Sequence, residues 1–146
     1  MTTAYVQIQN AIAQATAQAL EGGGTSVFEN RLRPVAAGKN AVVVRLEQSS
    51  ADRVVSGAKD HRTLYVIECY ARTPAGLDPV TEVDKLLELI HPVLEGLDLS
   101  ALAVMDSQLN AGTKWQFDDA DAQLACAIVG FEVMHRTPAN SLQPWT

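Results

Sequence analysis

Residues 62–72, with the sequence RTLYVIECYAR, form the stretch that decides the fold. Its side chains are rich in β-branched and aromatic types, which favour the extended backbone of a β-strand. These side chains are Thr63, Tyr65, Val66, Ile67 and Tyr70. We therefore predict a strand here, and we interpret the neighbouring segments outward from it.

A second strand is predicted at residues 41–47, because Val42, Val44 and Leu46 alternate with charged side chains. The fourteen residues between the two strands, 48–61 (QSSADRVVSGAKDH), have no clear periodicity. A connection of this length between antiparallel neighbours is unusual and often functional. We expect residues 48–61 to form an exposed, irregular segment.

Residues 4–20 are predicted to form an amphipathic helix, because apolar side chains recur there with helical period. These apolar positions are Tyr5, Ile8, Ile12, Ala15 and Ala19. The opposite side is expected to carry the glutamines Gln7, Gln9, Gln14 and Gln18. Three glycines at 22–24 should end the helix, and a short extended piece follows around Val27 and Phe28.

A second helix is predicted to begin at Asp78 and Pro79, which suit the N-cap and the first helical position. Its buried stripe is expected to consist of Val80, Val83, Leu87 and Ile90. Pro92 should end or kink this helix, because proline has no N–H to donate to the preceding turn.

The C-terminal third predicts two further strands. Residues 102–109 and 123–136 have strand composition; a turn is expected at 110–112 and a short strand near Trp115 and Phe117. The apolar face of the last strand changes phase near Gly130, which predicts a β-bulge. A tail that begins at about residue 137 is expected to be irregular.

The predicted order is helix, strand, strand, helix, strand, strand. It indicates an α+β fold with a single mixed or antiparallel sheet of about four to five strands and two helices packed on it. The chain has 146 residues, 47% of them apolar, which fits one domain over residues 1–146 with an ordinary core.

Charge is distributed unevenly along the chain. Residues 31–72 carry eight basic and four acidic side chains, a net of +4, whereas residues 73–146 carry three basic and eleven acidic ones, a net of −8. Such a chain can present opposite charges to its neighbours, which suits head-to-tail contacts between identical subunits. Alternatively, the charges mix on the folded surface and carry no such meaning. The overall net charge of −6 argues against nucleic acid as a partner.

Neither a secretory signal nor a membrane span is expected. Residues 1–20 contain no lysine or arginine, and no apolar run reaches the length of a membrane-spanning helix. The two cysteines, Cys69 and Cys126, lie in apolar stretches and are expected to be core residues in a reducing compartment.

The motifs of catalysis and metal binding fail on spacing. Gly38-Lys39 lacks the remainder of a phosphate loop, and the three histidines share no zinc-ligand spacing. His61 is interpreted as a loop residue, and His91 as a residue of the last helical turn. Glu68 and Glu132 are interpreted as outward-facing strand residues rather than a catalytic pair. We therefore expect no catalytic, cofactor-binding or metal-binding residues, no cofactor and no enzyme activity.

The pattern resembles the tail-terminator proteins of long-tailed phages, the family of the lambda-type minor tail protein U. The resemblance rests on the opening helix, on VFENRLRPVAAGKNAVVVRLEQ (27–48), on RTLYVIECYAR, and on the segments DPVTEVDKLLELIHPVL and QLACAIVGFEVMHRTP. It implies a structural virion protein of the phage tail, assembled in the host cytoplasm. Such a protein forms a homo-hexameric ring that caps the tail tube, stops its elongation and offers a surface for head–tail joining.

The partners implied by the resemblance are further copies of the chain, the tail tube protein and the head–tail connector, with no membrane contact and no direct reading of nucleic acid. Candidate subunit or tube contacts are Arg31, Arg33, Arg45, Asp52, Arg53, Val54, Val55 and Lys59. Two other functions remain open: another ring of the neck or head–tail junction, or a small ligand-binding α+β dimer.

Overall fold

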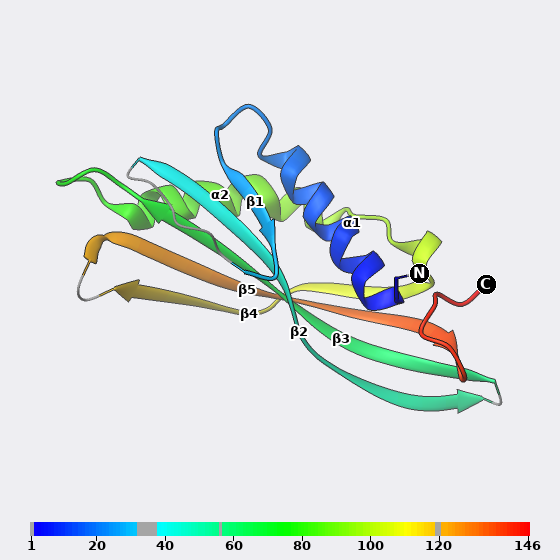
Figure 1. Ribbon diagram of the computed structural model, residues 1–146. Helices are drawn as coiled ribbons and strands as arrows, with labels where there is room; N and C mark the ends of the chain where they lie inside the picture. The colour runs from blue at the N-terminus through cyan, green and yellow to red at the C-terminus, as the bar shows by residue number, and fades with distance from the viewer. Residues whose placement is uncertain (1, 32–37, 56, 119–120) are drawn as a thin grey trace.

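The structure is a computed structural model that describes residues 2–31, 38–55, 57–118 and 121–146; in it, two helices cover one face of a five-stranded sheet (Figure 1). The helices are α1 (Ala4–Ala19) and α2 (Pro79–Glu95), with a short 3-10 turn, η1 (Ser100–Leu102), after α2. The strands are β1 (Ser26–Glu29), β2 (Lys39–Val55), β3 (Ala58–Arg72), β4 (Val104–Asp118) and β5 (Asp121–Pro138).

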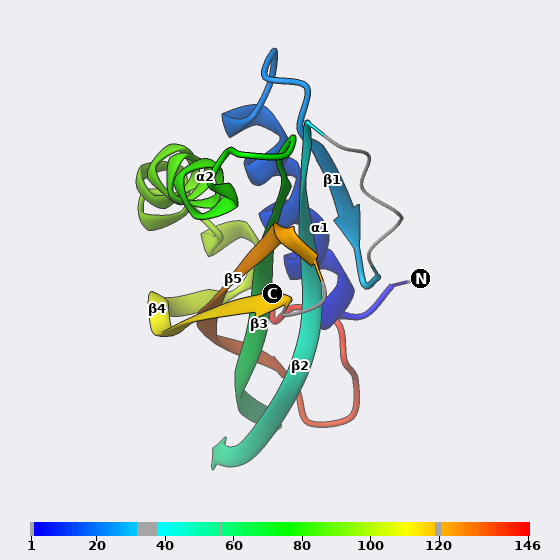
Figure 2. The ribbon, with the colours of Figure 1, turned by 90° about the vertical axis from the view of Figure 1, so that its left-hand side faces the viewer.

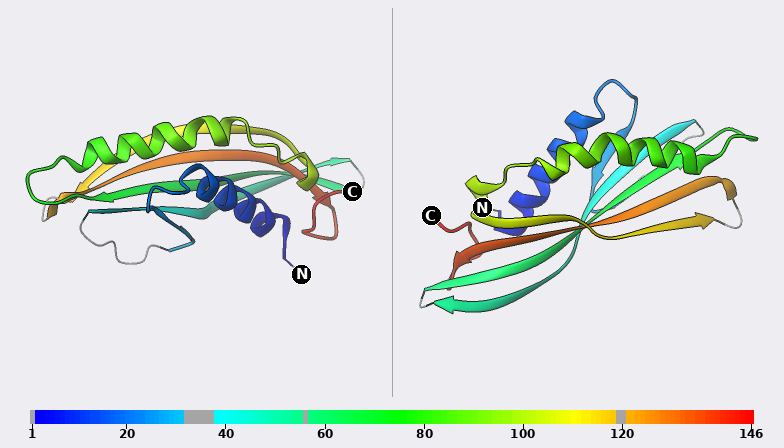
Figure 3. Two further views of the ribbon diagram at one scale, coloured as in Figure 1. Left: turned by 90° about the horizontal axis from the view of Figure 1, so that it is seen from above. Right: turned by 180° about the vertical axis from the view of Figure 1, so that it is seen from behind.

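The strands lie in the order β1-β2-β3-β5-β4. β1 runs parallel to β2, and the other pairs are antiparallel, so the sheet is mixed. The predicted α+β class with a single sheet is confirmed. Figure 3 shows the same sheet from above and from behind, with α1 and α2 on the same side of it.

The core lies between the helices and the half of the sheet beneath them, which we call the helix-covered end. Val44, Ile67 and Val129 form one row across β2, β3 and β5, and all three are buried. The helices add the buried side chains Ile8, Ile12, Val83, Leu86, Ile90 and Leu94. Continuous burial of β-branched and aliphatic side chains here supplies the main driving force for folding.

The second helix follows its predicted start but not its predicted end. The Asp78 carboxylate accepts a hydrogen bond from the Val80 backbone N–H at 3.0 Å, as expected of an N-cap. Pro92 was expected to end or kink the helix; the helix continues through Pro92 to Glu95, so the first of these two alternatives is wrong. Pro92 has no N–H to donate to the Glu88 carbonyl, but both residues are exposed, so water can hydrate that carbonyl. Leu94 is buried and packs the last turn of the helix against the core.

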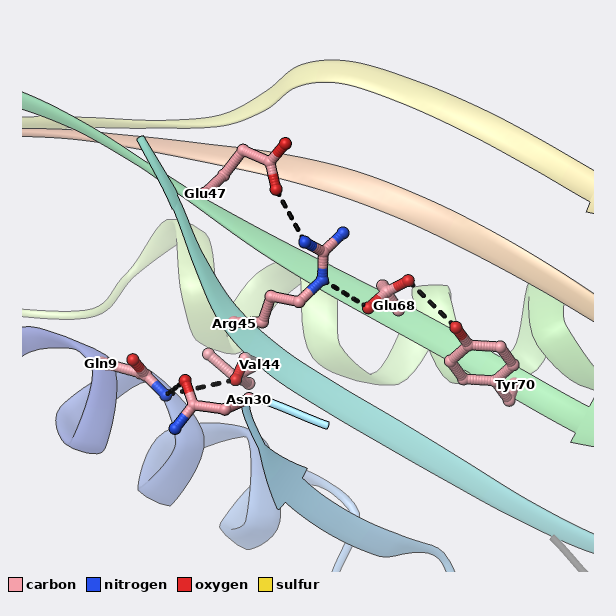
Figure 4. Close-up of polar contacts among 7 residues, drawn as sticks. All are labelled: Gln9, Asn30, Val44, Arg45, Glu47, Glu68 and Tyr70. Atoms are coloured by element: carbon pink, nitrogen blue, oxygen red, sulfur yellow. Dashed lines mark hydrogen bonds and ion pairs between the residues drawn. The ribbon is translucent and has the colours of Figure 1, made fainter. Parts of the chain in front are cut away.

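One of the four glutamines of α1 differs from the prediction. Gln9 is buried, and its side-chain amide donates to Asn30 Oδ1 at 2.8 Å and to the Val44 carbonyl at 3.4 Å (Figure 4). Asn30 follows β1 with a φ of 73°, in the left-handed region where asparagine is tolerated. The glutamine therefore ties the helix to the sheet edge instead of facing solvent.

The pairing of β5 with β3 contains no bulge. Their register runs without interruption from Ala58–Pro138 to Arg72–Leu124, and alternate residues of β5 are buried from Ala125 to Thr137. The predicted change of phase of β5 near Gly130 is wrong, because Cys126 is also buried, on the face that carries no helix. An irregularity does lie opposite Gly130, but its extra residues are in β4, between Leu109 and Thr113. At one end of β5 both faces carry apolar residues, and in the sequence this pattern cannot be distinguished from a change of the buried face.

β4 is one strand where two were predicted. It runs from Val104 to Asp118, and its pairing with β5 shifts register between Leu109 and Thr113. The glycine-containing segment at 110–112 that suggested a turn is absorbed as an irregularity within the strand. Residues 119–120, between β4 and β5, lie outside the described residues.

The 48–61 segment is the largest correction. Residues 48–55 continue β2 and residues 58–61 begin β3, so the expected irregular segment is the far part of a long hairpin. A register shift between Leu46 and Gln48 marks where the extension begins. Beyond this shift the polar side chains of Ser49, His61 and Thr63 face inward, so the segment has no hydrophobic period that would predict a strand. We call residues 48–55 and 58–64 the hairpin end.

Candidate assembly surfaces

The inner face of the hairpin end is held by a buried polar network. His61 and His135 lie opposite each other on β3 and β5, with ring planes 14° apart and centroids 5.0 Å apart. His61 bonds the Tyr5 hydroxyl at 3.0 Å through Nδ1 and the Thr137 hydroxyl at 2.8 Å through Nε2. His135 Nε2 bonds the Thr63 hydroxyl at 2.8 Å. We call His61 and His135 the histidine pair.

The histidine pair is held uncharged by its surroundings. Burial lowers the pKa of His135 from 6.5 to about 4, and the neighbouring His61 adds to this effect. Burial also lowers the pKa of His61; Lys59 reinforces the shift and Asp60 opposes it. His135 Nδ1 is buried without a hydrogen-bond partner. The interpretation of His61 as a loop residue is therefore wrong, and the pair was missed because its members are separated by 74 positions of chain.

Both chain termini pack onto the hairpin end (Figure 1). The Tyr65 hydroxyl donates to the Tyr5 carbonyl at 2.7 Å, and the Ala4 N–H donates to the Leu142 carbonyl at 2.6 Å. The Ala139 N–H donates to the Gly57 carbonyl at 2.8 Å, close to the turn of the hairpin. The base and one side of the hairpin are thus fixed to the body of the molecule.

The opposite face of the sheet carries charged pairs and no helix. The Arg136 guanidinium donates to both Asp60 oxygens, at 2.7 and 3.2 Å, and this lowers the pKa of Asp60. Arg45 donates to Glu68 at 2.8 Å and to Glu47 at 2.7 Å, and Glu68 accepts from the Tyr70 hydroxyl at 2.9 Å (Figure 4).

The candidate contact residues are spread over several parts of the fold. The backbones of Asp52, Arg53, Val54 and Val55 are in β2 and that of Lys59 is in β3, so these five lie together near the hairpin turn. Asp52 is exposed and Lys59 is half-buried. Arg31 is exposed after β1, Arg45 is engaged by carboxylates on the open face, and Arg33 lies outside the described residues. The described members thus do not form one basic face.

Two edges of the sheet are unpaired over long stretches. β4 is the terminal strand on one side. On the other side β1 pairs only with residues 41–44 of β2, so no described strand pairs with the outer edge of β2 from Arg45 to Val55. Figure 2 shows β1 beside the upper part of β2 only. Unpaired backbone groups along an edge favour addition of a strand from another chain.

A groove lies between α2 and β4. It has a volume of about 330 Å³ and is lined by apolar side chains, by two acidic groups and by His91 and Thr113. The apolar lining is Leu87, Ile90, Leu109, Trp115 and Val129, and the acidic groups are Asp84 and Glu88. We call this feature the α2–β4 groove. The groove was not predicted from the sequence. The signal that could have indicated it was the pair of aromatic residues, Trp115 and Phe117, that follows the turn predicted at 110–112.

No group of three or more metal-ligating side chains gathers in the described part of the chain. The two cysteines are buried, and burial raises the pKa of Cys69 to about 12 and that of Cys126 to about 11, so their thiols are poor nucleophiles at neutral pH. Among the described residues, no helix has the length and apolar character required to cross a membrane.

No protein-family model and no curated protein matches the sequence. Solved structures that share its fold include the following two. A chain from the virion of a native gene transfer agent particle aligns with a TM-score of 0.60 and 13% identity, over 89% of this chain and 95% of that one. A chain of the sheath/tube terminator of an extracellular contractile injection system, in its extended state, aligns with a TM-score of 0.51 and 10% identity, over 97% of this chain and 60% of that one.

Proposed function

We propose that this chain is a structural subunit of a phage tail or a related tail-like particle and that it acts as a tail terminator. In this role, copies of the chain form a ring, a hexamer in the proposal, that caps the tail tube, stops its elongation and provides a surface for head–tail joining. The proposal gains support from the fold shared with a gene transfer agent virion chain and an injection-system terminator chain. Under it, the protein is a virion component and not an enzyme.

The observation that carries the proposal is the presence of two different unsatisfied surfaces at the two ends of one elongated subunit. The hairpin end presents the free outer edge of β2, and the opposite end presents the free part of β4 with the α2–β4 groove (Figure 1). A closed ring of identical subunits needs two such complementary surfaces, because each contact joins unlike faces.

The contact residues proposed for this assembly are those near the hairpin turn, Asp52 to Val55 and Lys59, together with exposed Arg31 and with Arg33. Arg45 contributes less, since Glu68 and Glu47 already neutralise its charge. The tail tube protein and the head–tail connector are the proposed partners on the two sides of the ring.

A second ring of the neck is the main alternative, because a head–tail joining protein needs the same kind of subunit contacts. The α2–β4 groove favours a third candidate, a small ligand-binding dimer, because its volume is at the lower end of the range of about 300–1,000 Å³ typical of ligand pockets.

Native mass measurement combined with negative-stain imaging tests the proposal. A terminator is expected to form rings of about six subunits with a central channel and to bind the end of purified tail tubes, which halts their growth. A ring that binds connectors but never tubes supports the neck alternative. A monomer or dimer at every concentration and salt level, with no binding to tubes, contradicts the proposed function.

A further inference from the structure

The α2–β4 groove exists because α2 covers β5 but leaves the far half of β4 uncovered. Thr113, Trp115 and Phe117 point to the helix side of the sheet, in register with Val129, Ala127 and Ala125 of β5. The β5 residues of these pairs are buried, whereas Trp115 is 47% and Phe117 64% exposed. An apolar strip of this kind, flanked by a helix, is typical of an interaction surface.

The rim of the groove is acidic. α2 carries four acidic residues and one basic residue, a net charge of −3. Glu82 pairs with Lys85 at 2.9 Å, but within the described part of the chain neither Asp84 nor Glu88 forms an ion pair. The groove therefore favours an occupant with apolar side chains next to positive charge.

The hairpin turn of the same chain has this chemistry. Residues 53–59, which we call the hairpin tip, have the sequence RVVSGAK, with two valines between Arg53 and Lys59 and no acidic residue. β2 ends at Val55 and β3 begins at Ala58. The ends of β2 and β3 that flank this turn lie at the opposite end of the molecule from the end of β4 (Figures 1 and 3), so the tip does not serve its own groove.

We propose that the α2–β4 groove receives the hairpin tip of a second copy of the chain. This inference rests on the proposed function, in which copies assemble into a ring, and it specifies one contact of that ring. Val54 and Val55 supply the apolar side chains, and Arg53 and Lys59 lie against Asp84 and Glu88. The contact joins unlike surfaces, so repeating it produces a head-to-tail series.

Charge exchange tests this contact. Glu88→Arg and Arg53→Glu are each expected to weaken subunit association at least about tenfold, because each places like charges together. An equimolar mixture of the two variants is expected to restore rings of alternating subunits. In such a ring every contact pairs opposite charges, because the two substituted side chains meet at one kind of contact and native Arg53 meets native Glu88 at the other.

Glu95→Arg is the matched control, because Glu95 lies on the same helix but does not line the groove. Native mass spectrometry reports the assembly, and the thermal melt of each variant monomer verifies folding. Should Glu88→Arg lower the melting temperature, Glu88→Gln replaces it, with a smaller loss of assembly expected.

The outcomes separate this inference from the proposed function. Wild-type protein that never forms rings contradicts the proposed function itself. Rings that tolerate Glu88→Arg as well as Glu95→Arg leave the proposed function standing and overturn the groove contact. Loss of assembly in both single variants without recovery on mixing also overturns the pairing of groove and hairpin tip.

Discussion

At the helix-covered end of the sheet, one row across β2, β3 and β5 consists of Val44, Ile67 and Val129, whereas at the hairpin end the corresponding row is Ala51, His61 and His135. The first row packs in an apolar core, and the second sits in a network of rings and hydroxyls. The backbone pairing is the same in both rows. The two rows differ in the interactions that stabilise their inward side chains: burial of apolar surface in the first row and hydrogen bonds between buried polar groups in the second.

The largest expected effect lies in the apolar core. Phe131→Ala removes a fully buried ring from the core cluster and is expected to lower the free energy of unfolding by about 3–5 kcal/mol. Urea denaturation of the monomer measures this. Phe117→Ala is the matched control: its ring is on the same face of the sheet but exposed, so a change of less than about 0.5 kcal/mol is expected. Similar losses for both variants would contradict the assignment of the core.

The next effect belongs to the histidine pair and depends on pH. The pKa of His135 falls from 6.5 in the unfolded chain to about 4 in the folded one, so the unfolded chain binds more protons between these values. The stabilisation that comes from keeping His135 uncharged is therefore fully present above pH 6.5 and is lost as the pH falls toward 4. At about 1.4 kcal/mol per pKa unit, the loss is roughly 3 kcal/mol.

Urea denaturation at several values between pH 4 and 7 detects this loss. The groups that face the pair are Tyr5 from α1, Thr63, Lys59 and Asp60 from β3, and Thr137 from β5. His135→Gln is expected to flatten the pH dependence, because it removes the buried imidazole whose pKa falls on folding. Parallel pH profiles for wild type and His135→Gln would refute the role of the pair.

The smallest expected effect concerns the ion pair between Asp60 and Arg136, on the face of the hairpin end that carries no helix. Asp60→Asn removes the carboxylate that Arg136 holds at 2.7 Å, but both side chains are partly accessible, so a loss of about 0.5–1 kcal/mol is expected. Asp52→Asn, on the residue that faces Asp60 across the hairpin, is expected to cause no loss, because it relieves repulsion between like charges. Thermal melts at low and high salt distinguish the two variants. A larger loss for Asp52→Asn would show that the pairing is assigned to the wrong carboxylate.

The same contrast explains how far the sequence could be interpreted. Residues 41–47 and 62–72 could be predicted as strands, because apolar side chains alternate or cluster there. The start of α2 could be predicted from Asp78 and Pro79. Residues 48–55 and 58–61 were not identifiable as strand, because the polar side chains of Ser49 and His61 occupy inward positions there. Their partners, such as the Ser49–Thr63 hydroxyl bond at 2.8 Å, become visible only once the strands are placed together.

The assembly surfaces divide in a similar way. Sequence analysis singled out the valines and cations around residue 54, because apolar side chains in a polar segment are conspicuous. It did not identify the α2–β4 groove, since that surface combines residues from α2, β4 and β5 that are up to 45 positions apart. Trp115 is exposed because α2 does not cover this part of β4. How far α2 covers the sheet depends on the packing of the whole fold and cannot be predicted from the sequence around Trp115.

The burial of Cys69 and Cys126 has a practical consequence for optical measurements. With both native thiols protonated and inaccessible, maleimide dyes should react only with a cysteine introduced at the surface. A single Ser50→Cys substitution on exposed β2 would therefore carry one fluorophore per subunit without removal of the native cysteines. Energy transfer between donor- and acceptor-labelled copies would then follow subunit association in real time.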